Sequence, residues 1–148
     1  MLEIRFMETE DLEKVAAIEG SLFSKPWSVK GFQDSLNSQD TIYLTALVDG
    51  EVAGYCGLLR SFEEADITNV AVAETFQGKG IAFAMLKELL ALGAEKGILN
   101  FTLEVRVSNA PAIHVYEKLG FVNEGIRKNF YDMPKEDAMI MWRRGFLG

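Results

Sequence analysis

A glycine loop between an apolar strand and an apolar helix constrains this chain more than any other feature of its sequence. The strand is expected over 67–72, the loop over 77–82, and the helix from 81 to about 96, with Gly97 ending it. A helix start presents backbone N–H groups without partners and a partial positive charge. Such a loop binds phosphate when glycines let the ligand approach the backbone. A glycine turn that merely starts a helix is the alternative.

Two common phosphate-binding motifs are excluded by the residues in and after this loop. A Walker loop needs Ser or Thr after its Gly-Lys pair, and here Lys79 is followed by Gly80. A dinucleotide fingerprint needs a third glycine at the position of Phe83. The loop therefore belongs to neither of these classes.

Periodicity and capping residues divide the rest of the chain into further strands and helices. Thr9, Ser28 and Asn109 are each placed to cap a helix, and Asp49-Gly50 between two strand-like runs predicts a β-hairpin. The expected strands are 2–6, 41–48, 51–59, 67–72, 99–107, 121–126 and 137–144. The expected helices are 9–19, 28–36, 81–96 and 109–120. The loop between the last two strands contains Tyr131 and Pro134. This order predicts one mixed α/β layer architecture.

The composition is that of an ordinary globular protein. The 148 residues are 49% hydrophobic and 25% charged, and a chain of this length buries a core without covalent staples. We therefore expect residues 1–148 to form a single domain. The net charge of −7 argues against direct nucleic-acid binding, which rewards basic patches. It suits a cationic partner, although the same charge also simply keeps a protein soluble.

A single cysteine and a single histidine limit the chemistry of the chain. Cys56 cannot form an intrachain disulfide, and with His114 it cannot build a metal cluster, so no metal is expected. We interpret Cys56 as a small core residue, with a Cys56–His114 nucleophile pair as the alternative. The N-terminal residues do not form a signal peptide, and no apolar run is long enough to cross a membrane. We expect a cytoplasmic protein.

The glycine loop resembles that of a known family. Gln77-x-x-Gly80-x-Ala82 is similar to the Q/R-x-x-G-x-G/A signature of the GNAT acetyltransferases, in which alanine can replace the second glycine. The resemblance implies the GNAT fold, a central, mostly antiparallel sheet of about seven strands flanked by about four helices. It also implies acetyl-CoA as cosubstrate, with the pyrophosphate on the loop amides. The residues implied to bind acetyl-CoA are Val70, Ala71, Val72, Gln77, Gly78, Lys79, Gly80, Ile81, Ala82, Phe83 and Asn109.

The resemblance extends over nearly the whole chain and points to one branch of the family. Segments 23–32, 103–113, 116–121, 127–131 and 136–141 are similar to the ribosomal-protein-alanine N-acetyltransferases. This implies that the acceptor is the N-terminal α-amine of a protein, an alanine of a small-subunit ribosomal protein, presented by a basic peptide. Phe23, Pro26, Trp27 and Tyr131 are then implied to line the peptide groove.

Acetyl transfer to an amine needs a base for the amine and an acid for the leaving thiolate. Glu104 lies on the face of its strand opposite Leu103 and Val105, and the resemblance places the general base there. It places the general acid at Tyr116, and a phenol with pKa ~10 can protonate a thiolate of pKa ~8.5. Without the resemblance, Glu104 could be a surface side chain, and Tyr116 could pack on Ile113 with its hydroxyl in water.

Two other functions fit the same motifs. One is acetylation of a small amine such as a polyamine, which predicts a closed acidic pocket instead of a groove with aromatic walls. The other is an acetyl-CoA-binding module without activity, in which Glu104 or Tyr116 would be lost. Both residues are present.

Overall fold

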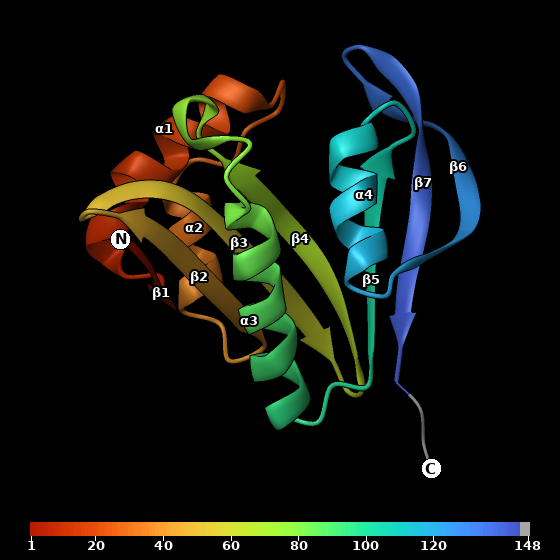
Figure 1. The fold of residues 1–148 in the computed structure, drawn as a ribbon, viewed down its shortest axis with the longest axis horizontal. Coiled ribbons are helices and arrows are strands. Elements are labelled where there is room, and N and C mark those ends of the chain that lie inside the picture. The colour runs from red at the N-terminus through yellow and green to blue at the C-terminus, as the bar shows by residue number, and fades with distance from the viewer. Residues whose placement is uncertain (146–148) are drawn as a thin grey trace.

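The computed structural model describes residues 1–145 and contains one seven-stranded sheet (Figure 1). The strands are β1 (Leu2–Phe6), β2 (Thr41–Val48), β3 (Glu51–Ser61), β4 (Glu64–Val72), β5 (Asn100–Arg106), β6 (Val122–Asp132) and β7 (Lys135–Arg144). The helices are α1 (Leu12–Leu22), α2 (Val29–Leu36), α3 (Ile81–Glu95) and α4 (Ala110–Lys118), with short 3₁₀ turns at Thr9–Asp11 and Glu74–Phe76. The expected mixed architecture is confirmed.

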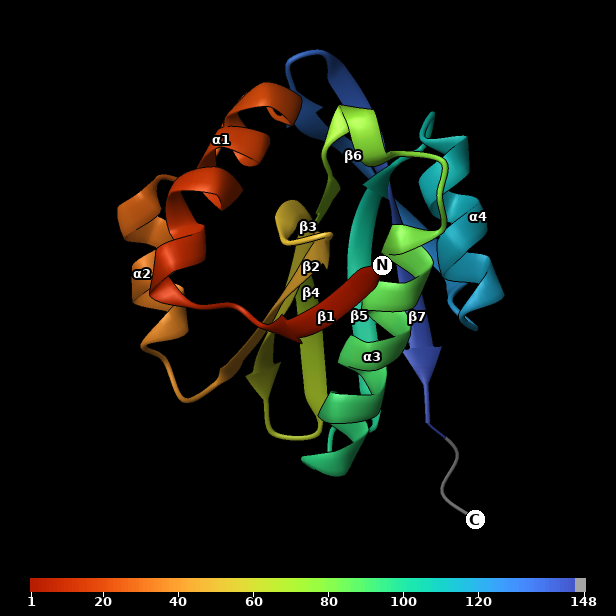
Figure 2. The same ribbon diagram turned by 60° about the vertical axis from the view of Figure 1, so that its left-hand side comes forward.

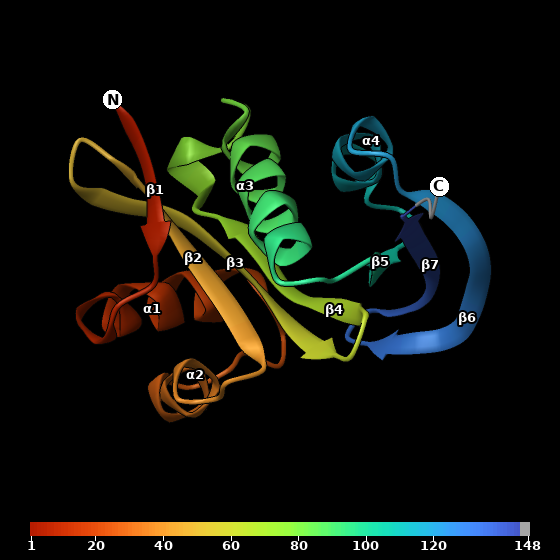
Figure 3. The same ribbon diagram turned by 90° about the horizontal axis from the view of Figure 1, so that it is seen from below.

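The helices cover both faces of the sheet. Figure 3 shows α1 and α2 on one face and α3 and α4 on the other. The face beneath α3 buries the larger apolar cluster, to which that helix contributes Met85, Leu86 and Leu89. The opposite face buries a smaller cluster around Phe32 and Tyr55. Burying apolar side chains on both faces fixes the sheet between two helical layers.

The sheet order β1-β2-β3-β4-β5-β7-β6 has one parallel neighbour pair, β4 and β5. Their pairing runs only from Glu64 opposite Asn100 to Asp66 opposite Thr102. Beyond that point the two strands diverge, as Figure 1 shows between the olive and teal arrows. Helix α3 makes the crossover between them, so its N-terminus lies at the open end of the divergence.

Most local predictions are confirmed. Ser28 Oγ accepts a hydrogen bond from the Gly31 N–H at 3.1 Å and caps α2. Asn109 Oδ1 accepts one from the Ala112 N–H at 3.3 Å and caps α4. The Asp49-Gly50 hairpin is present, with φ of 51° at the aspartate, because left-handed backbone suits the twist of a two-residue turn.

Thr9 is not a helix cap, contrary to the sequence prediction. Glu8 takes that position, and its N–H donates to Asp11 Oδ2 at 2.9 Å. Asp11 also accepts two bonds from Arg5, at 2.7 and 2.9 Å, and these hold the first turn as a 3₁₀ segment. The α-helix then runs three residues beyond the predicted end at Glu19.

Tyr131 lies in a strand and not in the predicted loop. A bulge around Asn129, whose φ is 54°, lets β6 continue to Asp132. Tyr131 consequently pairs with Glu136 of β7. Sequence patterning missed this because the bulge interrupts the alternation of the strand.

Candidate functional site

The glycine loop joins the end of β4 to the start of α3. Gly78 and Gly80 adopt φ of 78° and 77°, which side chains other than glycine rarely tolerate. Gly80 is the N-cap of α3 and provides no side-chain acceptor for the first amides. A Cβ atom at either glycine would meet nothing within 4 Å. The helix start therefore presents N–H groups to open space, as an anion site requires.

Gln77 anchors this loop to the preceding strand. Its Nε2 donates to the Val72 carbonyl at 3.0 Å, so the side chain itself is engaged with the protein. Val70 and Val72 are half-buried and pack against the apolar cluster under α3. Ala71 faces the other side of the sheet and joins the cluster under α1 and α2. The segment from Val70 to Val72, which is expected to bind the cofactor, therefore offers mainly backbone groups at the open end of the sheet.

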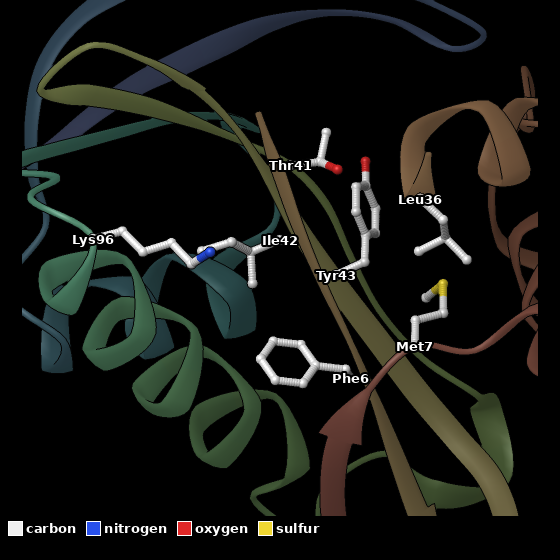
Figure 4. Close-up of a pocket in the computed structure, with 7 residues that line it drawn as sticks. All are labelled: Phe6, Met7, Leu36, Thr41, Ile42, Tyr43 and Lys96. Atoms are coloured by element: carbon white, nitrogen blue, oxygen red, sulfur yellow. The ribbon is translucent and has the colours of Figure 1, made fainter. Parts of the chain in front are cut away.

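Hollows of different size open on the surface of residues 1–145. A cleft of about 410 Å³ between α3 and α4 is lined by Phe83, Lys87, Lys118 and Arg143, among others. It brings Phe83 of the predicted cofactor residues beside cationic side chains, and Lys118 Nζ lies 6.0 Å from the Phe83 ring centroid. A smaller hollow of about 160 Å³ is lined by none of the predicted site residues. Figure 4 shows it at the β1–β2 edge, with Lys96 reaching toward it from the turn that ends α3.

Glu104 lies on β5, beyond the point at which β4 has diverged. The Arg127 Nη1 donates to its Oε2 at 3.0 Å. Among the described residues its Oε1 has no hydrogen-bond donor. Burial raises the pKa of the nearby Tyr131, and the charge of Glu104 adds to that rise. The structure therefore brings Glu104 and Tyr131 together and adds Arg127, which sequence reasoning missed.

Arg106 organises the end of the β6–β7 hairpin. Its guanidinium lies 4.3 Å from the Tyr131 ring centroid and donates to Glu136 Oε1 at 3.2 Å. Glu136 also accepts from the Ser108 N–H at 2.8 Å, and hydrogen bonding from the Ser108 side chain, together with this backbone bond, lowers the pKa of its carboxyl. Tyr131 is thereby held beside Arg106, the last residue of β5.

Tyr116 is buried in α4, with 8% of its surface exposed. Its ring packs on the Phe121 ring, with the two centroids 6.0 Å apart. Burial raises the pKa of its hydroxyl, which stays protonated at neutral pH. Within residues 1–145 the hydroxyl forms no hydrogen bond, and no described protein group therefore engages the hydroxyl. Its oxygen is nevertheless not fully buried, because the described residues contain no fully buried side-chain oxygen or nitrogen without a partner.

The segment joining α1 and α2 brings the predicted groove residues to the same side of the molecule. The ring of Trp27 packs on Phe32 and Tyr43, with centroids 5.3 and 6.4 Å apart, while Phe23 and Pro26 are exposed. Lys25 Nζ lies 2.7 Å from Asp132 Oδ2 at the end of β6. Figure 2 shows this end of α1 beneath the β6–β7 hairpin. Sequence reasoning missed the Lys25–Asp132 pair.

The alternative nucleophile pair is wrong. Cys56 is fully buried in β3, and burial raises the pKa of its thiol, which makes it inert. His114 is exposed on α4. Cys56 is the small core residue that the sequence predicted.

In residues 1–145, no group of three or more His, Cys, Asp or Glu side chains is arranged to hold a metal ion. No helix in this part of the chain has the length and apolar character needed to cross a membrane.

Comparison with known proteins identifies relatives along the whole chain. The model of the acetyltransferase (GNAT) family matches residues 12–121. A Bacillus subtilis (strain 168) protein, provisionally named a ribosomal protein bS18-alanine N-acetyltransferase, is 39% identical over 94% of this chain and 93% of its own. The Escherichia coli (strain K12) enzyme of that name is 36% identical over 95% and 96%. The crystal structure of the Escherichia coli ribosomal-protein-S18-alanine N-acetyltransferase superposes with a TM-score of 0.90 at 33% identity, covering 100% of this chain and 97% of that one.

Proposed function

The chain belongs to the GNAT acetyltransferase family, and we propose that it acetylates the N-terminal α-amine of a protein, an alanine of a small-subunit ribosomal protein. The observation that carries this proposal is the open end of the sheet where β4 and β5 stop pairing. The glycine loop leads into α3 at this end, Glu104 lies on β5 beyond its last pair with β4, and Tyr116 lies on α4, the helix that follows β5. The names of the relatives support the choice of acceptor. We propose that residues 1–148 act as one domain in the cytoplasm.

Acetyl-CoA is proposed to lie across the open end. The first amides of α3 would donate to its pyrophosphate, because the helix dipole and the free N–H groups favour an anion there. The backbone of β4 from Val70 to Val72 would run beside the pantetheine arm, and Asn109 would add a side-chain amide. Lys87 and Lys118 would supply positive charge toward the nucleotide end, along the cleft between α3 and α4.

Glu104 is proposed to act as the general base. A free α-amine has a pKa near ~8, so it is mostly protonated at neutral pH and must lose a proton before it attacks. Arg127 donates to Oε2 and orients the carboxylate, which leaves Oε1 to accept the proton directly or through one water molecule. Once Glu104 has passed this first proton to water, the neutral amine attacks the thioester carbonyl, a C–N bond forms, and the second amine proton passes to the emptied carboxylate.

Tyr116 is proposed to act as the general acid. When the tetrahedral intermediate collapses, the C–S bond breaks and the electron pair leaves on sulfur. The Tyr116 hydroxyl donates its proton to this thiolate, and its raised pKa ensures that the proton is present at every working pH. The products are the acetylated terminus and free coenzyme A.

The proposed acceptor is a chain terminus in a basic sequence. Deprotonating a lysine of pKa ~10.4 costs about 3 kcal/mol more than deprotonating an α-amine of pKa ~8. The net charge of −7 favours a basic peptide because its approach meets attraction and not repulsion. The aromatic wall at Trp27 and Tyr131 gives such a peptide a surface to lie on.

The test is acetylation of a panel of acceptors, read by mass spectrometry. Purified enzyme and acetyl-CoA are incubated with basic peptides that begin with alanine, with peptides that begin with other residues, and with a polyamine. We expect acetyl on the first residue of the alanine peptides and little product from the polyamine. A polyamine that outcompetes every peptide would favour the small-amine acetyltransferase.

A further inference from the structure

Glu19 is a carboxylate buried beneath the α1–α2 segment and unused by the proposed chemistry. It is 4% exposed. The Tyr55 hydroxyl donates to its Oε1 at 2.6 Å, and the Trp27 backbone N–H donates to its Oε2 at 3.0 Å. Within the described part of the chain it forms no salt bridge. Each oxygen is thus matched to one donor, and the two donors come from different elements.

These two bonds connect the α1–α2 segment to the centre of the sheet. Tyr55 lies in β3 and is fully buried. Trp27 is the last residue before Ser28, which caps α2. The bond from its N–H therefore fixes the backbone where the segment turns into the helix. The Trp27 ring then rests on Phe32 and Tyr43.

The chemistry of this junction requires a carboxylate. A glutamine has one carbonyl oxygen and an NH₂ group that only donates, so it cannot accept from both donors in the same way. Bonds to a charged acceptor are also stronger than neutral ones. Burying a charge is costly, so an apolar residue would serve better if α1 needed only to pack on the sheet. The arrangement is therefore suited to holding a loop in place.

We propose that Glu19 is a positioning residue for the acceptor site, which fixes the α1–α2 segment as one wall of the peptide groove. This role rests on the proposed function. The same segment carries Lys25, whose pair with Asp132 reaches the β6 side of the groove. A shift of the Trp27 backbone would move that wall relative to Tyr131. Glu19 contacts no substrate in this scheme and acts through Trp27.

Asp11 provides a matched control at the other end of the same helix. It is also 4% exposed and also accepts several bonds, from Arg5, Thr45 and the Glu8 N–H. None of these partners belongs to the α1–α2 segment. Asp11→Asn therefore perturbs an equally buried carboxylate, at the N-cap of α1, without touching the proposed groove wall.

The test compares Glu19→Gln with Asp11→Asn in steady-state kinetics at a temperature where both are folded. Glu19→Gln should raise KM for an alanine-terminated basic peptide by about tenfold, as expected when a bond to a charged group is lost. KM for acetyl-CoA should stay unchanged. Asp11→Asn should lower Tm but leave both KM values unchanged. Equal peptide KM in the two variants, or a parallel rise in both KM values of Glu19→Gln, would overturn the role.

A readout without turnover separates this role from the proposed function. In hydrogen–deuterium exchange, Glu19→Gln should speed exchange at the Trp27 amide by about tenfold, while Asp11→Asn should not. Tyr55→Phe, which keeps the bond to Trp27, supplies a milder variant if Glu19→Gln does not fold. Unchanged exchange at Trp27 rejects the anchoring. A wild-type enzyme that acetylates no peptide rejects the proposed function instead, even if Trp27 exchange responds as expected.

Discussion

The proposed cofactor end and the proposed acceptor end of this molecule are built in opposite ways. At the cofactor end, the glycine loop and the start of α3 are contiguous in sequence, and the groups on offer are backbone N–H donors. At the acceptor end, the α1–α2 segment meets β6 through Lys25 and Asp132, which are 107 positions apart. Side chains make that junction, and the position of each side chain depends on the register of strands that are distant in the sequence.

The difference predicts where each end is vulnerable. A backbone site tolerates most side-chain changes outside it but not a Cβ atom at a glycine with positive φ. A site assembled from side chains loses function gradually, because each pair contributes only part of its geometry. Substitutions at the cofactor end should therefore cost more than those at the acceptor end, with the chemical residues in between.

Gly80→Glu should have the largest effect. A side chain strains the backbone at φ of 77°, and its carboxylate repels the phosphates at the helix start. We expect acetyl-CoA binding to be undetectable by calorimetry. Gly50→Glu is the matched control, since that glycine also has a positive φ of 84° and open space but lies in the β2–β3 turn. Similar loss of binding in both variants would mean that backbone strain, and not the loop, explains the result.

Glu104→Gln should lower kcat by about 10²–10⁴-fold while acetyl-CoA affinity stays unchanged. The factor should shrink as pH rises past the α-amine pKa of ~8, because the amine then loses its proton without help. Glu124→Gln breaks a comparable carboxylate–arginine pair, with Arg144 at 2.7 Å, on the same side of the sheet. It should leave kcat unchanged. A Glu104→Gln factor that is flat with pH would assign Glu104 to acceptor positioning.

Tyr116→Phe should have a smaller effect on kcat, about 10²-fold, because a thiolate is already a fair leaving group. Burial keeps the phenol protonated, so the ratio of wild-type to variant rates should not vary between pH 6 and pH 9, as read from pH–rate profiles over roughly that range. Tyr43→Phe removes another buried hydroxyl, one that bonds Asn69 at 2.9 Å. It should lower Tm without a comparable loss of kcat. An unchanged kcat in Tyr116→Phe would mean that Tyr116 only packs in the core and is not the general acid.

Lys25→Ala should have the smallest effect. An exposed ion pair contributes about 0–1 kcal/mol, so peptide KM should rise by no more than about fivefold. The rise should vanish at high salt, where the wild-type pair is screened too. Lys30→Ala breaks an exposed pair with Asp34 inside α2 and should leave peptide KM unchanged. A tenfold rise that persists in salt would mean that Lys25 contacts the acceptor itself.

The sequence predicts the parts of this structure that local chemistry decides. The caps at Ser28 and Asn109, the Asp49-Gly50 turn and the start of α3 each depend on residues within a few positions. The order of the elements predicts the mixed α/β architecture, whereas the mostly antiparallel sheet is implied by the family resemblance. Sequence reasoning also separated the buried and exposed faces of β5 correctly, because alternation along a strand is local information.

The sequence does not predict the contacts that depend on strand register. Arg127 reaches Glu104 only because β6 and β5 both pair with β7, and a bulge at Asn129 shifts that register. Glu19 looks like an ordinary polar residue near the end of an amphipathic helix, and only the fold shows that it is buried. Thr9 was a reasonable cap by residue type, but the Arg5–Asp11 pair decided the local conformation.

The central claim is that the acceptor is a chain terminus, and two matched peptides test it most directly. Both carry the same basic sequence beginning with alanine. One has a free terminus and blocked lysines, and the other has a blocked terminus and free lysines. Because a lysine costs about 3 kcal/mol more to deprotonate, the account predicts rapid acetylation of the first peptide and almost none of the second. Comparable rates on the two peptides would contradict it.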